Sequence, residues 1–435
     1  MFDSIKDRHT ITSIEQDSLK SWLRLILLFT IGVVGTVGMW SVVVVMPAIE
    51  TEFNIDRGKA SLLYATTMVG FGLGNFLIGK VIDRFGLKIP IIFATIILVS
   101  SYLAAIISTE FWHLLILQIF MGTAAATFFG PAMADIGNFF EKRRGLAVAI
   151  IASANYVAGA FWPLLISSFL ELNNWKDVYF IIAIICATIM FPIAYFLKNN
   201  IANNISGNDL ATKNTSLNNL SPSTLQILLI LAGIGCCLAM AMPQVHIVAL
   251  CVERGFGLGI GAQVLSVMLF SGMISRIGFG YLSDKIGPVY TLFIGSFLQM
   301  LSLVFFLPFD SQLSLYIVSL MFGLSQGGIV PAYAMIIRKY LPIEEVGERV
   351  GLVIMATIVG MGLGGWMSGE IFDLTQSYKL AFVNGIFWNF TNLLIVTFIM
   401  WKIYFQKDKF HDEFQYCSRL RLNGIYRFRV SKNFT

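Results

Sequence analysis

Long apolar runs, separated by short charged or turn-rich breaks, follow one another along most of the chain. Each run has about 20 residues or more, which is the length that an α-helix needs to cross the hydrocarbon core of a bilayer. Twelve such runs lie near residues 23–48, 59–80, 89–108, 112–137, 146–170, 176–197, 224–250, 261–282, 288–307, 312–337, 347–368 and 380–404. The pattern predicts an all-α membrane protein with twelve transmembrane helices.

A polar stretch near the middle of the chain separates the apolar runs into six and six. Residues 198–223 are rich in Asn and Ser, which is typical of a linker. The chain is therefore predicted to have five parts, which are an N-terminal segment, a first six-helix half, the linker, a second half and a tail: 1–21, 22–197, 198–223, 224–404 and 405–435.

The composition excludes several classes of protein. Of the 435 residues, 57% are hydrophobic and 13% are charged, which is roughly half the ~25% of a soluble domain. A soluble enzyme, a secreted disulfide scaffold and a disordered chain do not have this composition. The four histidines lack metal-ligand spacing and no Walker motif is present, so we predict no enzymatic activity, no cofactor and no metal site.

Lysine and arginine residues gather on one side of the predicted helices. With the N-terminus placed in the cytoplasm, 24 of the 30 lie in cytoplasmic segments, 5 in outer loops and one, Arg276, within a helix. Because positive residues are retained on the cytoplasmic side, both termini are predicted to face the cytoplasm. The expected location is the cell membrane, either a plasma membrane or a bacterial inner membrane.

A short motif occurs after the second predicted helix of each half. The pattern G-x-x-x-D-[RK]-x-G appears twice with an offset of 201 residues, first with Gly79, Asp83, Arg84 and Gly86, then with Gly280, Asp284, Lys285 and Gly287. Pro131 and Pro331, in the fourth and tenth helices, are 200 residues apart. Two halves related by a parallel repeat are typical of transporters that rock around a site near the midplane.

At these residues the sequence resembles the major facilitator superfamily, in which this motif marks the short cytoplasmic loop of each half. The resemblance covers residues 20–405 and implies the major facilitator fold and secondary transport. A carboxylate such as Asp83 can face the N-terminal end of a neighbouring helix, where the dipole favours negative charge. Arg84 and Lys88 can bridge to acidic partners across the seam between the halves. A topology signal alone explains the cations but not the matched Gly and Asp, so we assign both loops to gating.

A finer resemblance lies before the fifth predicted helix. The run Phe139–Ala147, with the pair Arg143 and Arg144, is similar to the monocarboxylate-transporter branch and its bacterial oxalate–formate-type relatives. The resemblance implies a monocarboxylate-like substrate, adds the two arginines to the gating loops, and places Arg276 where that branch binds the substrate carboxylate. Some members carry Asp one turn earlier, but this chain has Gly272 there, so their proton-coupling chemistry does not transfer.

Arg276 lies well inside the eighth predicted helix. It precedes Asp284 by 8 residues and so stands roughly 12 Å above the inner boundary. Ionisable side chains at this depth are costly and indicate function, and a guanidinium suits bidentate contact with a carboxylate. The alternative is a structural arginine paired with backbone carbonyls or with an acid elsewhere. No Asp or Glu lies near the middle of any predicted helix, which favours a substrate anion as the partner.

The other polar residues within the predicted helices give weaker signals. His246 follows Pro243 in the seventh helix, and it can take up and release protons near neutral pH, although a neutral hydrogen bond between helices is an equal alternative. Further candidates for substrate contact, which could equally serve packing or ordinary interhelical hydrogen bonds, are Gln118, Asn155, Gln326 and Tyr333.

Together these features predict a secondary active transporter of a small, monocarboxylate-like organic anion that works by alternating access as a monomer in a lipid bilayer. Proton symport is a candidate mode of coupling, and no feature indicates nucleic-acid binding. The alternatives are transport of another metabolite, such as an amino acid, a nucleoside or a hydrophobic compound, and a transporter-like sensor that binds its ligand without moving it.

Overall fold

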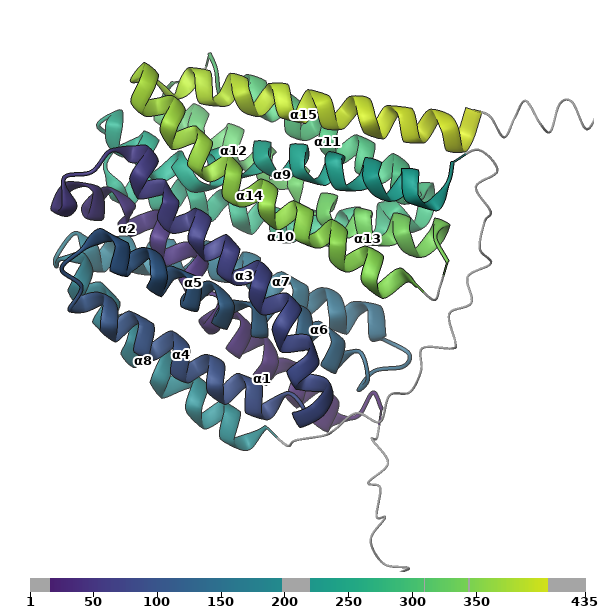
Figure 1. Ribbon diagram of the computed structural model, residues 1–435, viewed down its shortest axis with the longest axis horizontal. Helices are drawn as coiled ribbons and strands as arrows, with labels where there is room; N and C mark the ends of the chain where they lie inside the picture. The colour runs from purple at the N-terminus through teal and green to yellow at the C-terminus, as the bar shows by residue number, and fades with distance from the viewer. Residues whose placement is uncertain (1–15, 198–219, 309, 343–344, 406–435) are drawn as a thin grey trace, which may run out of the picture.

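The computed structural model describes residues 16–197, 220–308, 310–342 and 345–405, apart from the side chains of residues 79–80, 82–84 and 404–405. Most of the predicted N-terminal segment, linker and tail therefore lies outside the described residues. Within these ranges the regular structure is helical (Figure 1), and twelve helical segments are long and apolar enough to cross a bilayer. The predicted all-α fold with twelve spans is confirmed.

The helices of the first bundle precede the linker. They are α1 (Leu19–Gly35), α2 (Val37–Phe53), α3 (Arg57–Phe85), α4 (Lys88–Ile106), α5 (Phe111–Thr127), α6 (Gly130–Ile136), α7 (Arg144–Leu170) and α8 (Trp175–Phe196). Those of the second bundle are α9 (Pro222–Glu253), α10 (Leu258–Ile286), α11 (Pro288–Phe305), α12 (Gln312–Gln326), α13 (Ile329–Tyr340), α14 (Val346–Thr375) and α15 (Tyr378–Met400), which continues into the π-helical turn η2 (Trp401–Phe405).

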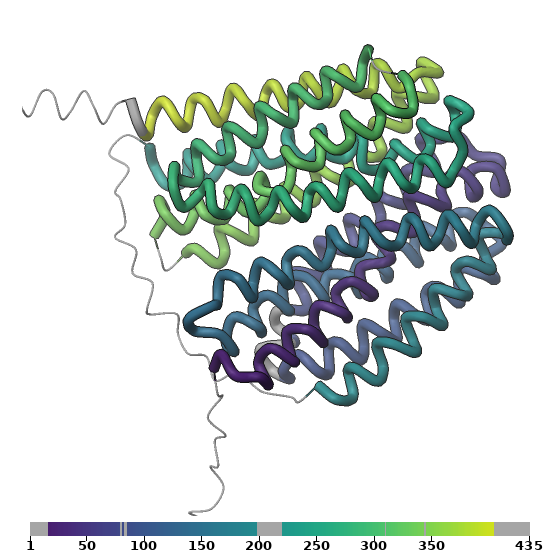
Figure 2. Tube along the Cα trace, turned by 180° about the vertical axis from the view of Figure 1, so that it is seen from behind, coloured from purple at the N-terminus to yellow at the C-terminus, as the bar shows by residue number. Residues whose placement is uncertain are grey.

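The two bundles lie side by side, with their helices roughly parallel or antiparallel. We call the end at which α8 stops and α9 starts the linker end, and the opposite end the far end. Both views show the bundles closer together at the far end than at the linker end (Figures 1 and 2). Among the described residues, hydrogen bonds join the bundles at the far end, through Arg57 and Gly58, and further along the seam, through Arg276.

The fourth and tenth spans are both broken near their middle. The fourth is divided into α5 and α6, and the tenth into α12 and α13. Pro131 lies in the first turn of α6 and Pro331 in the first turn of α13. Proline is tolerated there because the first backbone N–H groups of a helix have no intrahelical partner. The repeated prolines therefore mark equivalent helix breaks in the two bundles.

The repeated motif places a glycine at the same turn in both bundles. Gly86 follows α3 with φ of 72°, and Gly287 follows α10 with φ of 90°. A side chain disfavours this left-handed region, so glycine is required where a long helix turns directly into the next one. The backbone thus explains the second matched glycine. Gly79 lies within α3, and the side chains of Asp83 and Arg84 are outside the described part of the structure.

Close helix crossings also repeat with the offset of 201 residues. A Cβ atom added at Gly122 of α5 would overlap the carbonyl oxygen of Thr67 of α3. A Cβ atom at Gly323 of α12 would overlap the carbonyl oxygen of Met268 of α10 in the same way. In each bundle, one backbone therefore rests directly on another, which is how small residues bring membrane helices together.

These crossings should be sensitive to a single methyl group. We expect Gly122→Ala and Gly323→Ala each to lower the free energy of unfolding by about 2 kcal/mol, within the usual cost of overpacking, because backbone cannot yield as a side chain does. The matched control is Gly385→Ala in α15, where the nearest atom would be an ordinary 3.7 Å away. Thermal unfolding of the purified protein in detergent measures the difference. Equal melting temperatures for Gly122→Ala and Gly385→Ala would contradict the close crossing.

Candidate functional site

Arg276 connects the two bundles across the seam. Its Nη1 donates a 2.6 Å hydrogen bond to the carbonyl oxygen of Ala152 in α7, which belongs to the first bundle. Its Nε donates a 3.3 Å hydrogen bond to the carbonyl oxygen of Gly327, at the break between α12 and α13. An intact helix would use the Gly327 carbonyl to accept from residue 331, but Pro331 has no N–H. The repeated proline therefore frees the oxygen that Arg276 binds.

Tyr156 of α7 packs against Arg276. The guanidinium carbon lies 4.6 Å from the centre of the Tyr156 ring, which is a favourable cation–π distance. A Cβ atom at Gly272, one turn before Arg276, would lie only 2.6 Å from Cε1 of the same ring. The absence of a side chain at Gly272 therefore lets Tyr156 lie directly on α10. An aspartate at this position would collide with the ring, which gives a physical reason for the missing acid.

Gln326, the last residue of α12, lies beside this group. Its Oε1 accepts a 2.5 Å hydrogen bond from Nε2 of Gln244 in α9. Its own Nε2 is buried without a hydrogen-bond partner among the described residues, and it would lie 3.5 Å from a Cβ atom at Gly272. We call Arg276, Tyr156, Gly272, Gln326 and Gln244 the central cluster.

The central cluster carries no carboxylate. The ion pairs of the described residues involve Arg24, Arg57, Lys176, Arg254 and Arg349, and none involves Arg276. Backbone carbonyls are thus the partners of Arg276 in this conformation, as the structural alternative envisaged. Carbonyl dipoles lower the cost of the charge but do not neutralise it, so the cluster keeps a net positive charge.

The side chains of the remaining polar candidates form hydrogen bonds to neighbouring helices. Gln118 is buried in the first bundle, where its Oε1 accepts from the Thr67 hydroxyl at 2.9 Å. Tyr333 is buried in the second bundle and donates to Oδ1 of Asn392 at 3.1 Å. Asn155 precedes Tyr156 in α7, but its Oδ1 accepts from the Trp40 indole at 3.1 Å. Of these weaker candidates, Asn155 is the neighbour of Tyr156 in α7 and Gln326 lies beside Gly272, so these two are the ones close to the surroundings of Arg276.

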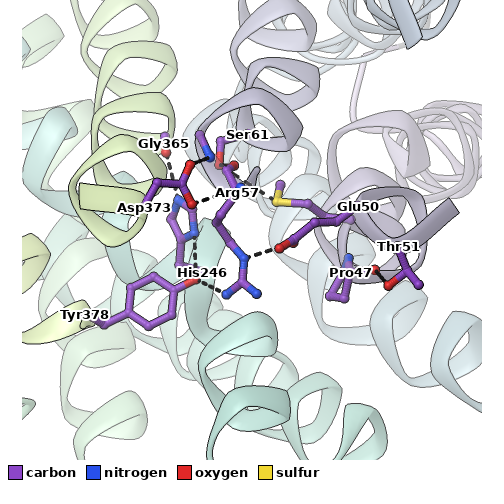
Figure 3. Close-up of polar contacts among 11 residues, drawn as sticks. Pro47, Glu50, Thr51, Arg57, Ser61, His246, Gly365, Asp373 and Tyr378 are labelled. Atoms are coloured by element: carbon purple, nitrogen blue, oxygen red, sulfur yellow. Dashed lines mark hydrogen bonds and ion pairs between the residues drawn. The ribbon is translucent and has the colours of Figure 1, made fainter. Parts of the chain in front are cut away.

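A second polar group joins the bundles at the far end (Figure 3). The carboxylate of Asp373 in α14 accepts the backbone N–H groups of Arg57 at 3.1 Å and Gly58 at 2.6 Å. These are the first residues of α3, so an acid from the second bundle caps a helix of the first. A negative charge at a helix N-terminus is favoured by both the free N–H groups and the helix dipole.

The side chain of Arg57 extends the same connection. It donates to Glu50 at 2.9 Å and to the hydroxyl of Tyr378 in α15 at 2.6 Å. The Tyr378 hydroxyl lies 3.2 Å from Nδ1 of His246, and Nε2 of His246 lies 2.7 Å from the carbonyl oxygen of Gly365. Because a carbonyl only accepts, Nε2 must carry the proton and Nδ1 accepts from Tyr378. We call Asp373, Arg57, Glu50, Tyr378 and His246 the far-end latch.

His246 therefore belongs to the far-end latch. It is fully buried, and the hydrogen-bond partners of both ring nitrogens lie in the second bundle. Gln244, two residues earlier in α9, belongs to the central cluster. One helix thus carries a residue of each group.

The structure adds an ion pair that sequence reasoning missed. Arg24 of α1 binds Asp135 of α6 through two bonds of 2.8 and 2.9 Å, and both side chains are buried. Arg24 had been assigned to the cytoplasmic segment, but α1 begins at Leu19 because the Ser18 hydroxyl caps its first turn. Arg276 is therefore not the only cation within a span. The signal in the sequence was a base just inside the start of the first apolar run and an acid just inside the end of the fourth, which lie on the same side of the predicted membrane.

The predicted gating residues that the structure describes lie at the linker end. Lys88 contacts the carbonyl oxygen of Tyr195 at 2.8 Å, within the first bundle, and does not cross the seam. The residues whose side chains are exposed are Arg143, Arg144 and Asp284. Among the described residues, no hydrogen bond or ion pair joins these three side chains across the seam.

Comparison with known families finds a match to a sequence model described as the Major Facilitator Superfamily, over residues 28–342 and 264–416. The MFS transporter asaE of Aspergillus flavus is 25% identical over 303 residues, which cover 67% of this chain and 65% of that protein. Monocarboxylate transporter 13 of Rattus norvegicus is 25% identical over 331 residues, 74% of this chain and 75% of that protein. The match to the fungal relative thus spans slightly less than two thirds of that relative's length.

The fold is also found among solved structures. A crystal structure of a mutant of the nucleoside transporter NupG superposes with a TM-score of 0.67, at 12% sequence identity, and the match covers 86% of this chain and 99% of that one. At this level of identity the likeness concerns the fold alone.

The far-end latch should hold the bundles together. Asp373→Ala removes the acceptor for two backbone N–H groups of α3, so we expect the far ends to separate in a larger fraction of molecules. Spin labels on the variants Leu172→Cys and Leu313→Cys report this distance by double electron–electron resonance. The two leucines lie at the far end and are 83% and 70% exposed. Cys186, Cys236, Cys237 and Cys251 are buried, and Cys417 is replaced by Ser.

The matched control is Asp310→Ala. Asp310 is another far-end carboxylate and is more exposed than Asp373, but its partner, Arg254, belongs to the same bundle. The control should leave the distance distribution unchanged, whereas Asp373→Ala should add a longer distance. Identical distributions for the two variants would show that Asp373 does not hold the seam closed.

Proposed function

The chain belongs to the major facilitator superfamily, and from this premise we propose that it is a secondary active transporter of a small, monocarboxylate-like organic anion. Arg276 binds the anionic group of the substrate. The observation that carries the proposal is the position of this arginine, which touches both bundles inside the membrane and has no carboxylate partner among the described residues.

The chemistry of the guanidinium supports an anionic substrate. An arginine near the centre of a membrane helix costs about 2.5–3.5 kcal/mol on insertion scales. Two of its five N–H donors are used by carbonyl oxygens, and the side chain is only half-buried. A carboxylate that reaches it gains charge-assisted hydrogen bonds and neutralises the charge. The similarity to monocarboxylate transporter 13 also favours this substrate class.

The arrangement of the bundles supports alternating access. The far-end latch closes one end, and the bundles diverge toward the other, with the central cluster between them (Figures 1 and 3). With the linker in the cytoplasm, as the lysine and arginine distribution predicts, this conformation opens inward. Transport then requires the latch to open while the linker ends approach. The whole site lies in one chain, so a monomer in the cell membrane suffices.

Substitution of Arg276 tests the proposal. In proteoliposomes, we expect Arg276→Ala to abolish uptake of labelled monocarboxylates, and Arg276→Lys to lower kcat/KM at least tenfold, because lysine keeps the charge but loses the planar fork. Arg254→Ala is the control, since it removes an arginine from a far-end pair without touching the central cluster. Thermal unfolding verifies that each variant is folded.

An unchanged affinity for anions in Arg276→Ala would overturn the proposal. Uptake of a neutral nucleoside, an amino acid or a hydrophobic compound would then identify the alternative substrate class. Binding of a ligand without any uptake would identify a sensor.

His246 is the residue that we propose for proton coupling. Protonation of Nδ1 would remove the acceptor of the Tyr378 hydroxyl, which also accepts from Arg57 and so links the bundles. The other acidic groups of the latch keep their partners: Glu50 accepts from the side chain of Arg57, and Asp373 accepts from the backbone N–H groups at the start of α3. A proton on His246 therefore loosens one connection of the latch.

We expect His246→Gln to retain exchange of substrate across the membrane at equal pH but to lose stimulation of uptake by a pH gradient. Glutamine keeps hydrogen-bonding groups without the titration. Both rates are measured in the same proteoliposomes, with Gln263→Met, a change at an exposed far-end glutamine, as the control. Undiminished stimulation by the gradient would mean that protons do not act through His246.

A further inference from the structure

We propose that Gln326 is a second substrate-binding residue, which donates a hydrogen bond to an acceptor oxygen that the anion carries close to its carboxylate. This inference rests on the proposed function, because it takes Arg276 as the binding site of the carboxylate. It adds a specificity-determining contact and narrows the substrates to anions with a second oxygen group.

The inference starts from an unpartnered amide. Gln326 is 1% exposed, and its Nε2 has no hydrogen-bond partner among the described residues. Leaving a buried donor unpaired costs about 1–3 kcal/mol, so such groups are rare in native proteins and call for an explanation. Because Gln244 donates to Oε1 of Gln326, the Nε2 donor is the end of the amide that is left over. A ligand that arrives at the central cluster can pair with it.

The amide is held in place. A Cβ atom at Gly327 would overlap the carbonyl oxygen of Gly272 and lie 2.6 Å from the backbone nitrogen of Arg276. The end of α12 thus rests on the backbone of α10, which places Gln326 directly beside that helix. The bond to Gln244 fixes the side chain as well. A donor held in this way binds without a large loss of side-chain entropy.

The amide and the guanidinium border the same ring. Arg276 contacts Tyr156 on its face, and Gly272, one turn away, meets the edge of that ring and the Nε2 of Gln326. The guanidinium carbon lies 4.6 Å from the centre of the ring, and Nε2 lies 3.5 Å from a Cβ position that is 2.6 Å from ring atom Cε1, so both donors lie beside one aromatic ring. A carboxylate on Arg276 brings its first few carbons to the amide, and an oxo or hydroxyl oxygen on one of them can accept from Nε2.

An acid without this oxygen would leave the amide unpaired. Sites built to hydrogen-bond a substrate reject analogues that lack the bonding group far more strongly than apolar pockets reject a missing methylene. The chain should therefore prefer an oxo acid to the unsubstituted acid of equal length by at least tenfold in Kd. Tyr156 supplies an apolar face but no discrimination of this kind.

The test is direct binding to the purified full-length protein, with the matched pairs pyruvate and propionate, and 3-oxobutyrate and butyrate. Wild type should prefer the oxo acid of at least one pair by tenfold or more. Gln326→Met, which keeps the size but has no donor, should reduce this preference to about one by weakening the oxo acid alone. Gln326→Glu should weaken both members of the pair, because its carboxylate repels anions. Gln263→Met should change neither.

The outcomes separate this inference from the proposed function. If Arg276→Ala loses both acids but Gln326→Met keeps the full preference, or if wild type shows no preference, the role of Gln326 is refuted and the anion site stands. If wild type binds none of the acids, or Arg276→Ala binds them as well as wild type, the proposed function fails and this inference fails with it.

Discussion

The need to satisfy one half-buried guanidinium determines much of the structure around the seam. Arg276 has to find acceptors where water is scarce, and it finds them in two backbone carbonyls. One is available because Pro331 cannot donate to Gly327, and the other belongs to α7 of the opposite bundle. Arg276 therefore connects the helix break, the contact between the bundles and the positive charge of the site, so that a change in one of these features affects the other two.

The far-end latch and the central cluster differ in the interactions that they form between the bundles. The far-end latch includes a helix cap, in which the carboxylate of Asp373 meets the N–H groups of α3 only when α3 and α14 meet. In the central cluster, Arg276 contacts an aromatic ring and backbone carbonyls, which do not neutralise its positive charge. Since α9 carries both Gln244 and His246, a rotation or shift of this helix acts on both groups.

The spans and the repeat could be predicted from the sequence because both depend on patterns along one chain. Apolar length fixes a transmembrane helix, and Gly86 and Gly287 report a backbone turn that only glycine adopts readily. Partners across the bundle were harder to predict, since they depend on the rotation of each helix. Gln118 and Gln326 look alike in the sequence, but one lies in a saturated hydrogen-bond network and the other keeps a free amide.

The same dependence explains what sequence reasoning left out. Arg57 was counted only among the cations of the outer loops, and Asp373 was given no role, because nothing in the sequence says that α3 and α14 meet. Arg24 and Asp135 each lie close to the end of an apolar run, where a charge is ordinary, so their pairing became visible only with α1 against α6.

The matched crossings at Gly122 and Gly323 have a consequence for how this protein can evolve. Both are contacts of a glycine with a backbone carbonyl, so they do not depend on the identity of the residue that supplies the oxygen, which is Thr67 in one bundle and Met268 in the other. The residue that supplies the oxygen can therefore change without loss of the crossing. If the central cluster binds the substrate as proposed, substitutions at Tyr156 or Gln326 would change the preferred ligand while these crossings are kept.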